Sequence, residues 1–100
     1  MYAVVGRWNM DANQMEQQQA FLTERIVPSV SRAEGFVSGY WSRPTPDGAA
    51  YSFIVFADEA SATAFAASVR RDPHDRRTSG VHGEELTIVQ IAANAHAAVD

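Results

Sequence analysis

The sequence has 100 residues, of which 46% are hydrophobic and 20% charged, with a net charge of −4 and no cysteine. The acidic balance weighs against a nucleic-acid-binding protein, and the lack of cysteine excludes disulfides, iron–sulfur clusters and thiolate zinc sites. No apolar run approaches the length of a membrane helix, about 20 residues, and residues 1–9 lack the pattern of a signal peptide. We therefore expect one cytoplasmic domain over residues 1–100, which binds neither membrane nor nucleic acid.

The first third of the chain predicts a strand followed by a long helix. Residues 2–9 are rich in β-branched and aromatic side chains, which favour a strand. Asp11 is a suitable N-cap, and from residue 12 to about residue 32 one face recurs at helical spacing. The residues on this face are Met15, Gln19, Leu22, Ile26 and Val30. Pro28 should bend the last turns, and Gly35 should end the segment.

The rest of the chain predicts three more strands and a second helix. The expected elements are strands at 36–43, 51–57 and 85–92 and a helix at 59–71. The turn residues Pro44-Thr45-Pro46-Asp47-Gly48 predict that the second and third strands form an antiparallel hairpin. Asp58 should cap the second helix, and residues 72–83 form a polar loop after it.

The order of these elements, β-α-β-β-α-β, determines the expected fold class. Helical crossovers join parallel strands within each half, and the hairpin joins the halves. The sequence therefore predicts an α+β domain of the ferredoxin-like type, with a four-stranded antiparallel sheet and two helices on one face.

Both faces of this sheet are rich in apolar residues. In the third strand Tyr51, Phe53 and Val55 point to one side, and Ile54 and Phe56 to the other. Two helices can cover only one face, so we expect the other to pack against a second copy in a homodimer. The alternative is a mildly apolar outer face that stays solvated.

Two passages resemble a known family. The run Glu34-Gly35-Phe36 to Pro44 matches the pattern x-G-F-x-x-x-x-x-x-x-P, and the strand 51–56 is followed by Asp58-Glu59-Ala60-Ser61 at the start of a helix that contains Phe65. These passages resemble the antibiotic-biosynthesis-monooxygenase-like group of the dimeric α/β-barrel superfamily. Ala57 stands where that group usually has Trp.

The resemblance implies several activities. Members oxygenate electron-rich aromatics such as anthrones or quinols without a cofactor, or degrade haem; other relatives are isomerases or bind small molecules without known catalysis. The haem degraders carry an Asn on the first strand, a Trp on the second helix and a His just after it. Here Arg7 fits the first position better than Asn9, Ala66 or Ser68 replaces the Trp, and only His74 lies near the third. We therefore expect no haem, no other cofactor and no metal site.

Oxygenation requires aromatic walls for a flat substrate, and donors that stabilise the anion formed when a proton leaves. Arg7, Asn9, Trp41 and Arg43 are the candidate substrate and anion contacts, and His74 is a candidate base. Alternation puts Arg7 and Asn9 on one side of the first strand and Trp8 on the other. In the second strand Trp41 and Arg43 share a side opposite Tyr40. If this side and the Arg7 side of the first strand form the same face of the sheet, the four residues can lie together. The alternative gives these residues structural roles and makes 72–83 a plain surface loop.

Two functions remain open at this point. One is a homodimeric, cofactor-independent monooxygenase acting on a small aromatic or quinol-type metabolite. The other is a non-catalytic dimeric module that binds a small molecule or acts through an interface. An enzyme needs a solvent-reachable cavity of about 300 Å³ or more. If Trp8, Tyr40 and Trp41 fill the interior, the non-catalytic module is favoured.

Overall fold

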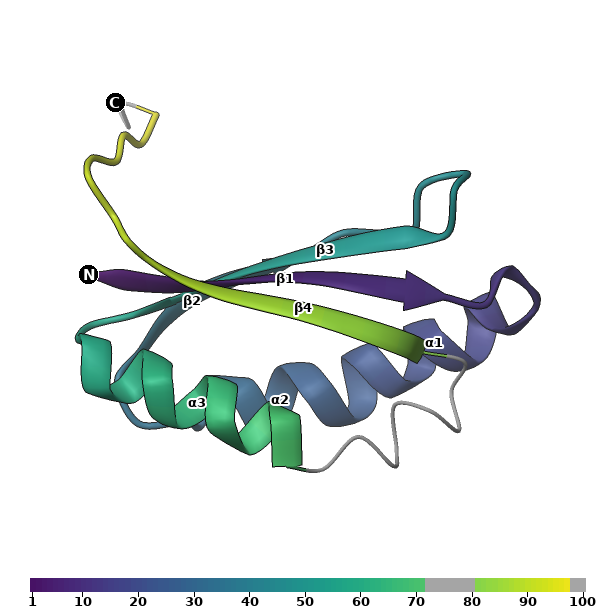
Figure 1. The fold of residues 1–100 in the computed structure, drawn as a ribbon, viewed down its shortest axis with the longest axis horizontal. Coiled ribbons are helices and arrows are strands. Elements are labelled where there is room, and N and C mark those ends of the chain that lie inside the picture. Colours follow the sequence, from purple (N-terminus) through teal and green to yellow (C-terminus); the bar gives the residue numbers. More distant parts are fainter. Residues whose placement is uncertain (72–80, 98–100) are drawn as a thin grey trace.

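The computed structural model describes residues 1–71 and 81–97, and it has the predicted element order. The helical elements are a 3-10 turn η1 (Ala12–Gln14), α1 (Met15–Phe21), a π-helical turn η2 (Leu22–Ile26), α2 (Val27–Ser31) and α3 (Glu59–Arg71). The strands are β1 (Tyr2–Met10), β2 (Phe36–Trp41), β3 (Ala49–Phe56) and β4 (Val81–Gln90). They form one antiparallel sheet in the order β2-β3-β1-β4, and the labelled helices lie on one face of it (Figure 1). The ferredoxin-like α+β prediction is confirmed.

Local signals in the sequence determine where most elements begin and end. Asp11 Oδ1 accepts a hydrogen bond from Asn13 N at 2.9 Å, and Asp58 Oδ1 accepts one from Ser61 N at 2.8 Å, so both predicted caps are present. The bond from Ser61 lowers the pKa of the Asp58 carboxyl below its ordinary value, because it stabilises the carboxylate. Gly35 has a φ of 78°, the left-handed conformation expected where a helix ends.

The hairpin is displaced slightly from the predicted boundaries. Thr45 N donates to Ala49 O at 2.8 Å, so the turn closes at Ala49 and β3 begins there rather than at Tyr51. β2 ends at Trp41 rather than Arg43, because Tyr51 N donates to the Ser42 hydroxyl at 2.8 Å instead of to a backbone carbonyl. The fourth strand likewise runs from Val81 to Gln90 instead of 85–92.

The long first helix is continuous but not regular. Pro28 has no N–H to donate to the carbonyl of Glu24, and its ring would clash with that carbonyl in an α-helix. The five residues of η2 immediately precede this region, and Val27 N–H bonds to Leu22 O, five residues back. The predicted bend is therefore taken up as a widened π-turn. Within the described residues, no helix is both long and apolar enough to cross a membrane.

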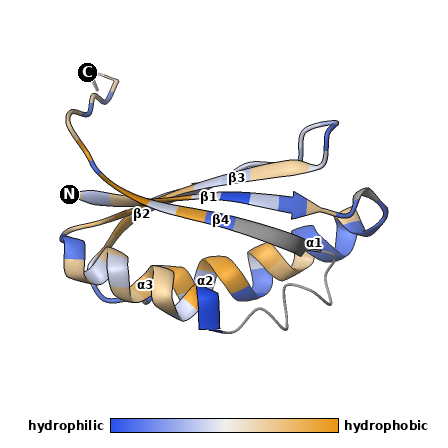
Figure 2. Ribbon diagram, viewed as in Figure 1, coloured by the Kyte–Doolittle hydropathy of each residue, from blue (hydrophilic) through white to orange (hydrophobic). Residues whose placement is uncertain are grey.

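The hydrophobic core occupies only part of the space between sheet and helices. It consists of Val4, Val30, Ile54, Phe56, Ala62 and Ala66. The small side chains of Ala62 and Ala66 are fully buried and let α3 approach the sheet closely. Phe56 contacts the rings of Phe36 and Phe65, at centroid distances of 6.4 and 5.2 Å. Figure 2 shows hydrophobic residues in α2 and hydrophilic residues gathered around η1, at the other end of the helical layer.

The face of the sheet opposite the helices carries exposed aromatic side chains. Tyr40 is 75% exposed, Tyr51 47% and Phe53 41%. Tyr40 pairs with Phe53 across β2 and β3, and Phe53 with Val5 across β3 and β1, so these side chains adjoin one another. We call this surface the outer face; no element of the described chain covers it (Figure 1).

Candidate functional site

A pocket of about 940 Å³ opens between the sheet and the first helix, beside the core. Its walls come from α1, η2 and α2 on one side and from β1, β2, β3 and α3 on the other. The helix-face residues Met15, Gln19, Leu22, Ile26 and Val30 all line it. Of these five, only Val30 is buried, and Met15 is 46% exposed. This helical face therefore borders a pocket at its N-terminal end instead of packing fully on the sheet.

Two indoles, those of Trp8 and Trp41, form the sheet side of the pocket. Ser52 on β3 pairs with Trp41 of β2 on one side and with Gly6 of β1 on the other, so these positions share the helix-facing side. Trp8 lies on that same side, two residues after Gly6, and its Nε1 donates a hydrogen bond to Ser52 Oγ at 3.0 Å. We call the pair of rings, with Ser52 between them, the indole floor.

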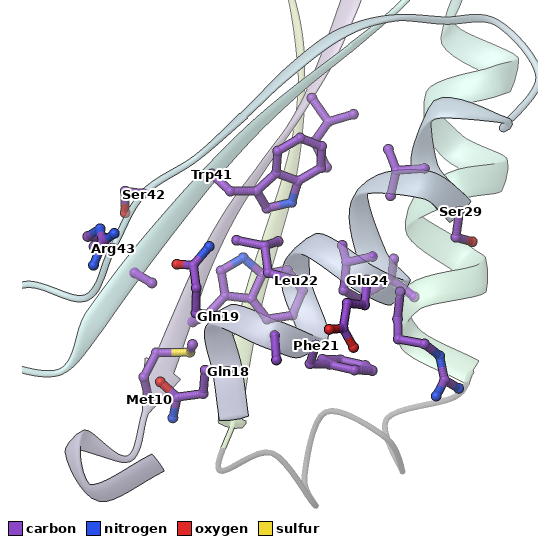
Figure 3. A pocket seen from close by; sticks show the side chains of 18 of the residues that line it. Met10, Gln18, Gln19, Phe21, Leu22, Glu24, Ser29, Trp41, Ser42 and Arg43 are labelled. Carbon is purple, nitrogen blue, oxygen red and sulfur yellow. The ribbon is translucent and has the colours of Figure 1, made fainter. Parts of the chain in front are cut away.

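The surface of the pocket is mostly apolar, but polar side chains also line it, among them Glu24, Arg25 and Arg43. Figure 3 shows the nitrogen edge of Trp41 directed toward Leu22 and the middle of the pocket, with Gln19 between Trp41 and Met10. Gln18 lies beside Met10 and is only 6% exposed. The side-chain Nε2 of Gln18 donates a hydrogen bond to Asp11 O at 2.7 Å. The side-chain Oε1 of Gln18 has no hydrogen-bond partner among the described residues. The site therefore offers flat aromatic surface together with amide and indole groups, which suits a flat ligand that bears oxygen atoms.

The structure separates the predicted site residues. Trp41 and Arg43 line the pocket, with Arg43 at its side on the chain that leaves β2 (Figure 3). Arg7 and Asn9 alternate with Trp8 along β1, so they lie on the outer side of the strand and outside the lining. The expected meeting of Arg7 and Asn9 with Trp41 on one face is not found, because the register aligns Trp41 with Ser52 and Gly6. His74 lies outside the described residues.

The described part of the lining contains no histidine, so it supplies no residue of the kind that haem degraders use to hold iron. Among the described residues there is also no group of three His, Cys, Asp or Glu side chains that could hold a metal ion.

Two residues of the pocket were not predicted from the sequence as site residues. The sequence leaves open whether Trp8 lines a pocket or fills the interior, and it does not single out Gln18. A signal for the first exists, since Gly6-Arg7-Trp8 and Gly39-Tyr40-Trp41 repeat the pattern Gly-x-Trp. No comparable signal marks Gln18.

No family model matches the sequence, and no curated protein matches it. Several solved structures are similar in three dimensions. A proposed antibiotic biosynthesis monooxygenase from Deinococcus radiodurans is 12% identical with a TM-score of 0.75, over 99% of this chain and 100% of that one. The haem degrader MhuD from Mycobacterium tuberculosis, with two haems in its active site, is 13% identical with a TM-score of 0.71, over 96% and 100%.

SnoaB, a cofactor-independent oxygenase from Streptomyces nogalater, is 18% identical with a TM-score of 0.68, over 93% of this chain and 94% of that one. At identities this low, the similarity of these structures shows a shared fold and nothing more. The resemblance noticed in the sequence is thus confirmed at that level: the chain has the fold of the antibiotic-biosynthesis-monooxygenase-like proteins.

Proposed function

We propose that this chain binds a flat aromatic metabolite of the anthrone or quinol type on the indole floor and oxidises it with molecular oxygen, without a bound cofactor. The observation that carries the proposal is the pocket, whose volume of about 940 Å³ lies well above the minimum for a small-molecule site. A mostly apolar surface interrupted by polar side chains is typical of such sites. The likeness in fold to a cofactor-independent oxygenase supports the same reading.

Each group in the pocket has a distinct part in this proposal. The rings of Trp8 and Trp41 stack against the substrate. The N–H of Trp41 and the guanidinium of Arg43 act as donors toward the oxyanion that forms when the substrate loses a proton. His74 remains the predicted base. The roles in substrate binding expected for Arg7 and Asn9 also remain predictions. Both residues lie on the outer side of β1.

The proposed reaction balances without a further reductant. In an anthrone, the ring CH₂ loses both hydrogens and becomes a carbonyl. One atom of O₂ enters the product, and the other leaves as water. The protein's contribution is to orient the ring, favour loss of the first proton and stabilise the anion that reacts with O₂.

The proposal includes a homodimer assembled through the outer face. Tyr40, Tyr51 and Phe53 expose between 41% and 75% of their surface there. A monomer rarely leaves adjoining aromatic side chains exposed in this way, and two sheets packed face to face would bury them.

The rival function is a non-catalytic binder that uses the same pocket. The test is aerobic incubation with dithranol, a dihydroxyanthrone, while O₂ uptake is measured and the product is identified by mass spectrometry. We expect O₂ uptake and quinone formation above the rate without protein, both reduced in Trp41→Ala. Binding without O₂ uptake would support the rival, and the absence of both binding and uptake would contradict the site.

A further inference from the structure

Two glycines beneath the indole floor have no backbone reason to be glycine. Gly6 lies in the middle of β1 and Gly39 in the middle of β2, and neither has a positive φ. A glycine inside a strand lacks a side chain to pack and loses more chain entropy on folding than any other residue. A glycine inside a strand often marks a place where another group approaches the backbone closely.

The space above Gly39 is occupied by the ring of Trp41. A Cβ at position 39 would lie 2.9 Å from Trp41 Cη2, closer than Cβ atoms approach other atoms in folded proteins, and 3.0 Å from Cζ3, tighter than nine in ten such contacts. It would lie 3.5 Å from Phe36 Cε1, an ordinary contact. The far edge of the indole therefore lies directly against the backbone of residue 39. The ring edge can come this close to the sheet because no side chain projects from residue 39.

Gly6 has the same relation to Trp8, again two residues later. A Cβ at position 6 would lie 2.7 Å from Trp8 Nε1 and 2.6 Å from Ser52 Oγ. These are the two atoms that form the hydrogen bond between β1 and β3. A side chain at position 6 would thus displace both partners of the bond that holds this indole in place.

We propose that Gly39 and Gly6 are positioning residues that keep the pocket open: each lets the indole two residues later lie flat, and so sets the clearance between the indole floor and the first helix. A methyl group at either position lifts the ring toward the helix and reduces that clearance for a planar ligand. The displaced atoms belong to side chains rather than to backbone, so the ring moves and the sheet stays. This inference rests on the proposed function for the ligand, but the position of the rings can be tested without one.

The test uses protein labelled with fluorotryptophan, whose two fluorine NMR resonances are assigned with Trp8→Phe and Trp41→Phe. Gly39→Ala should shift the Trp41 resonance and leave that of Trp8, and Gly6→Ala should do the reverse. Ser38→Ala is the control: Ser38 of β2 pairs with Val55 of β3 and lies outside the pocket lining, so this change should shift neither indole resonance. A Trp41 resonance that does not move in Gly39→Ala would overturn the inference.

Anaerobic titration with dithranol supplies the second readout. Gly39→Ala should weaken binding about tenfold or more, since overpacking by one methyl group commonly has effects of this size. Gly39→Ala with Trp41→Phe should regain the affinity of Trp41→Phe alone, because the smaller ring leaves room for the methyl group. Unchanged affinity in Gly39→Ala, or no recovery in the double variant, would contradict the inference.

The outcomes separate the two proposals. If the wild-type protein binds no dithranol, the proposed function fails, and the fluorine resonances alone decide whether the glycines position the rings. If Gly39→Ala does not fold, the double variant decides. If Gly39→Ala with Trp41→Phe folds while Gly39→Ala alone does not, the clash is with the indole. If neither variant folds, the inference is overturned.

Discussion

The indole nitrogen of Trp8 and the hydroxyl oxygen of Ser52 lie 3.0 Å apart, although the two residues are 44 positions apart in the chain. Ser52 is 4% exposed and Trp8 is half-buried, so this bond forms in a partly buried region on the inner side of the sheet. It fixes the rotation of one indole and thereby one half of the pocket floor.

Removal of the Ser52 hydroxyl should loosen that half of the floor. We expect Ser52→Ala to lower the free energy of unfolding by about 1 kcal/mol, the usual net contribution of such a bond, and to weaken dithranol binding. Chemical denaturation and anaerobic titration measure the two effects. Ser38→Ala serves as the comparison; if both variants behave alike, the bond has no part in shaping the site.

The π-turn before Pro28 should respond to removal of that proline. Pro28→Ala restores an N–H donor and removes the ring that excludes a regular helix, so we expect a gain of about 1 kcal/mol or more in the free energy of unfolding. The same change rotates Leu22 and Ile26, which line the pocket, so dithranol should bind more weakly. Pro46→Ala, in the hairpin turn, is the control. A variant that is less stable and binds normally would refute this view of the π-turn.

The cap of α3 predicts a pH dependence. Hydrogen bonding to Ser61 lowers the pKa of Asp58 below its ordinary value of 3.8, so the carboxylate stabilises the folded state above that pH, and the contribution disappears as pH falls through the lowered pKa. Asp58→Ala should therefore melt at a lower temperature than wild type at pH 7, with the gap closing in acid.

Thermal melts between neutral pH and strongly acidic pH measure this difference. Asp47→Ala, which removes an exposed carboxylate from the hairpin turn, controls for the loss of charge. A gap for Asp58→Ala that persists unchanged below the lowered pKa would show that the effect is not due to the ionised cap.

The outer face should hold two copies together. Sedimentation equilibrium at micromolar concentration should give twice the chain mass of 10.9 kDa for the wild type. Phe53→Glu places a charge among Tyr40, Tyr51 and Val5 and should yield the monomer, whereas Thr63→Glu on the exposed side of α3 should not. A wild-type monomer would contradict the argument from the apolar outer face.

The elements that could be predicted from the sequence are those with local causes. Asp11, Asp58 and Gly35 mark helix ends through their own hydrogen bonds and dihedral angles, and α3 occupies the predicted range. The strand alternation was also sufficient to place Trp8 and Arg7 on opposite sides of β1.

The site could be predicted only in part, because it depends on relations between strands. Alternation assigns the two faces of one strand, but only the register Trp41–Ser52–Gly6 tells which face of β1 joins which face of β2. That register brings Trp41 to Trp8 instead of to Arg7 and Asn9. The pocket itself was not predictable from helical spacing, which marks Met15 and Leu22 as inward-facing without saying that they border open space.

The most direct test of the central claim, that the indole floor is the binding site for a flat aromatic ligand, is anaerobic titration of wild type and Trp41→Ala with dithranol. We predict saturable binding by the wild type and at least about tenfold weaker binding by the variant, which loses an aromatic contact and an N–H donor while its melting stays cooperative. Equal affinity in the two proteins would contradict the claim and place any ligand elsewhere.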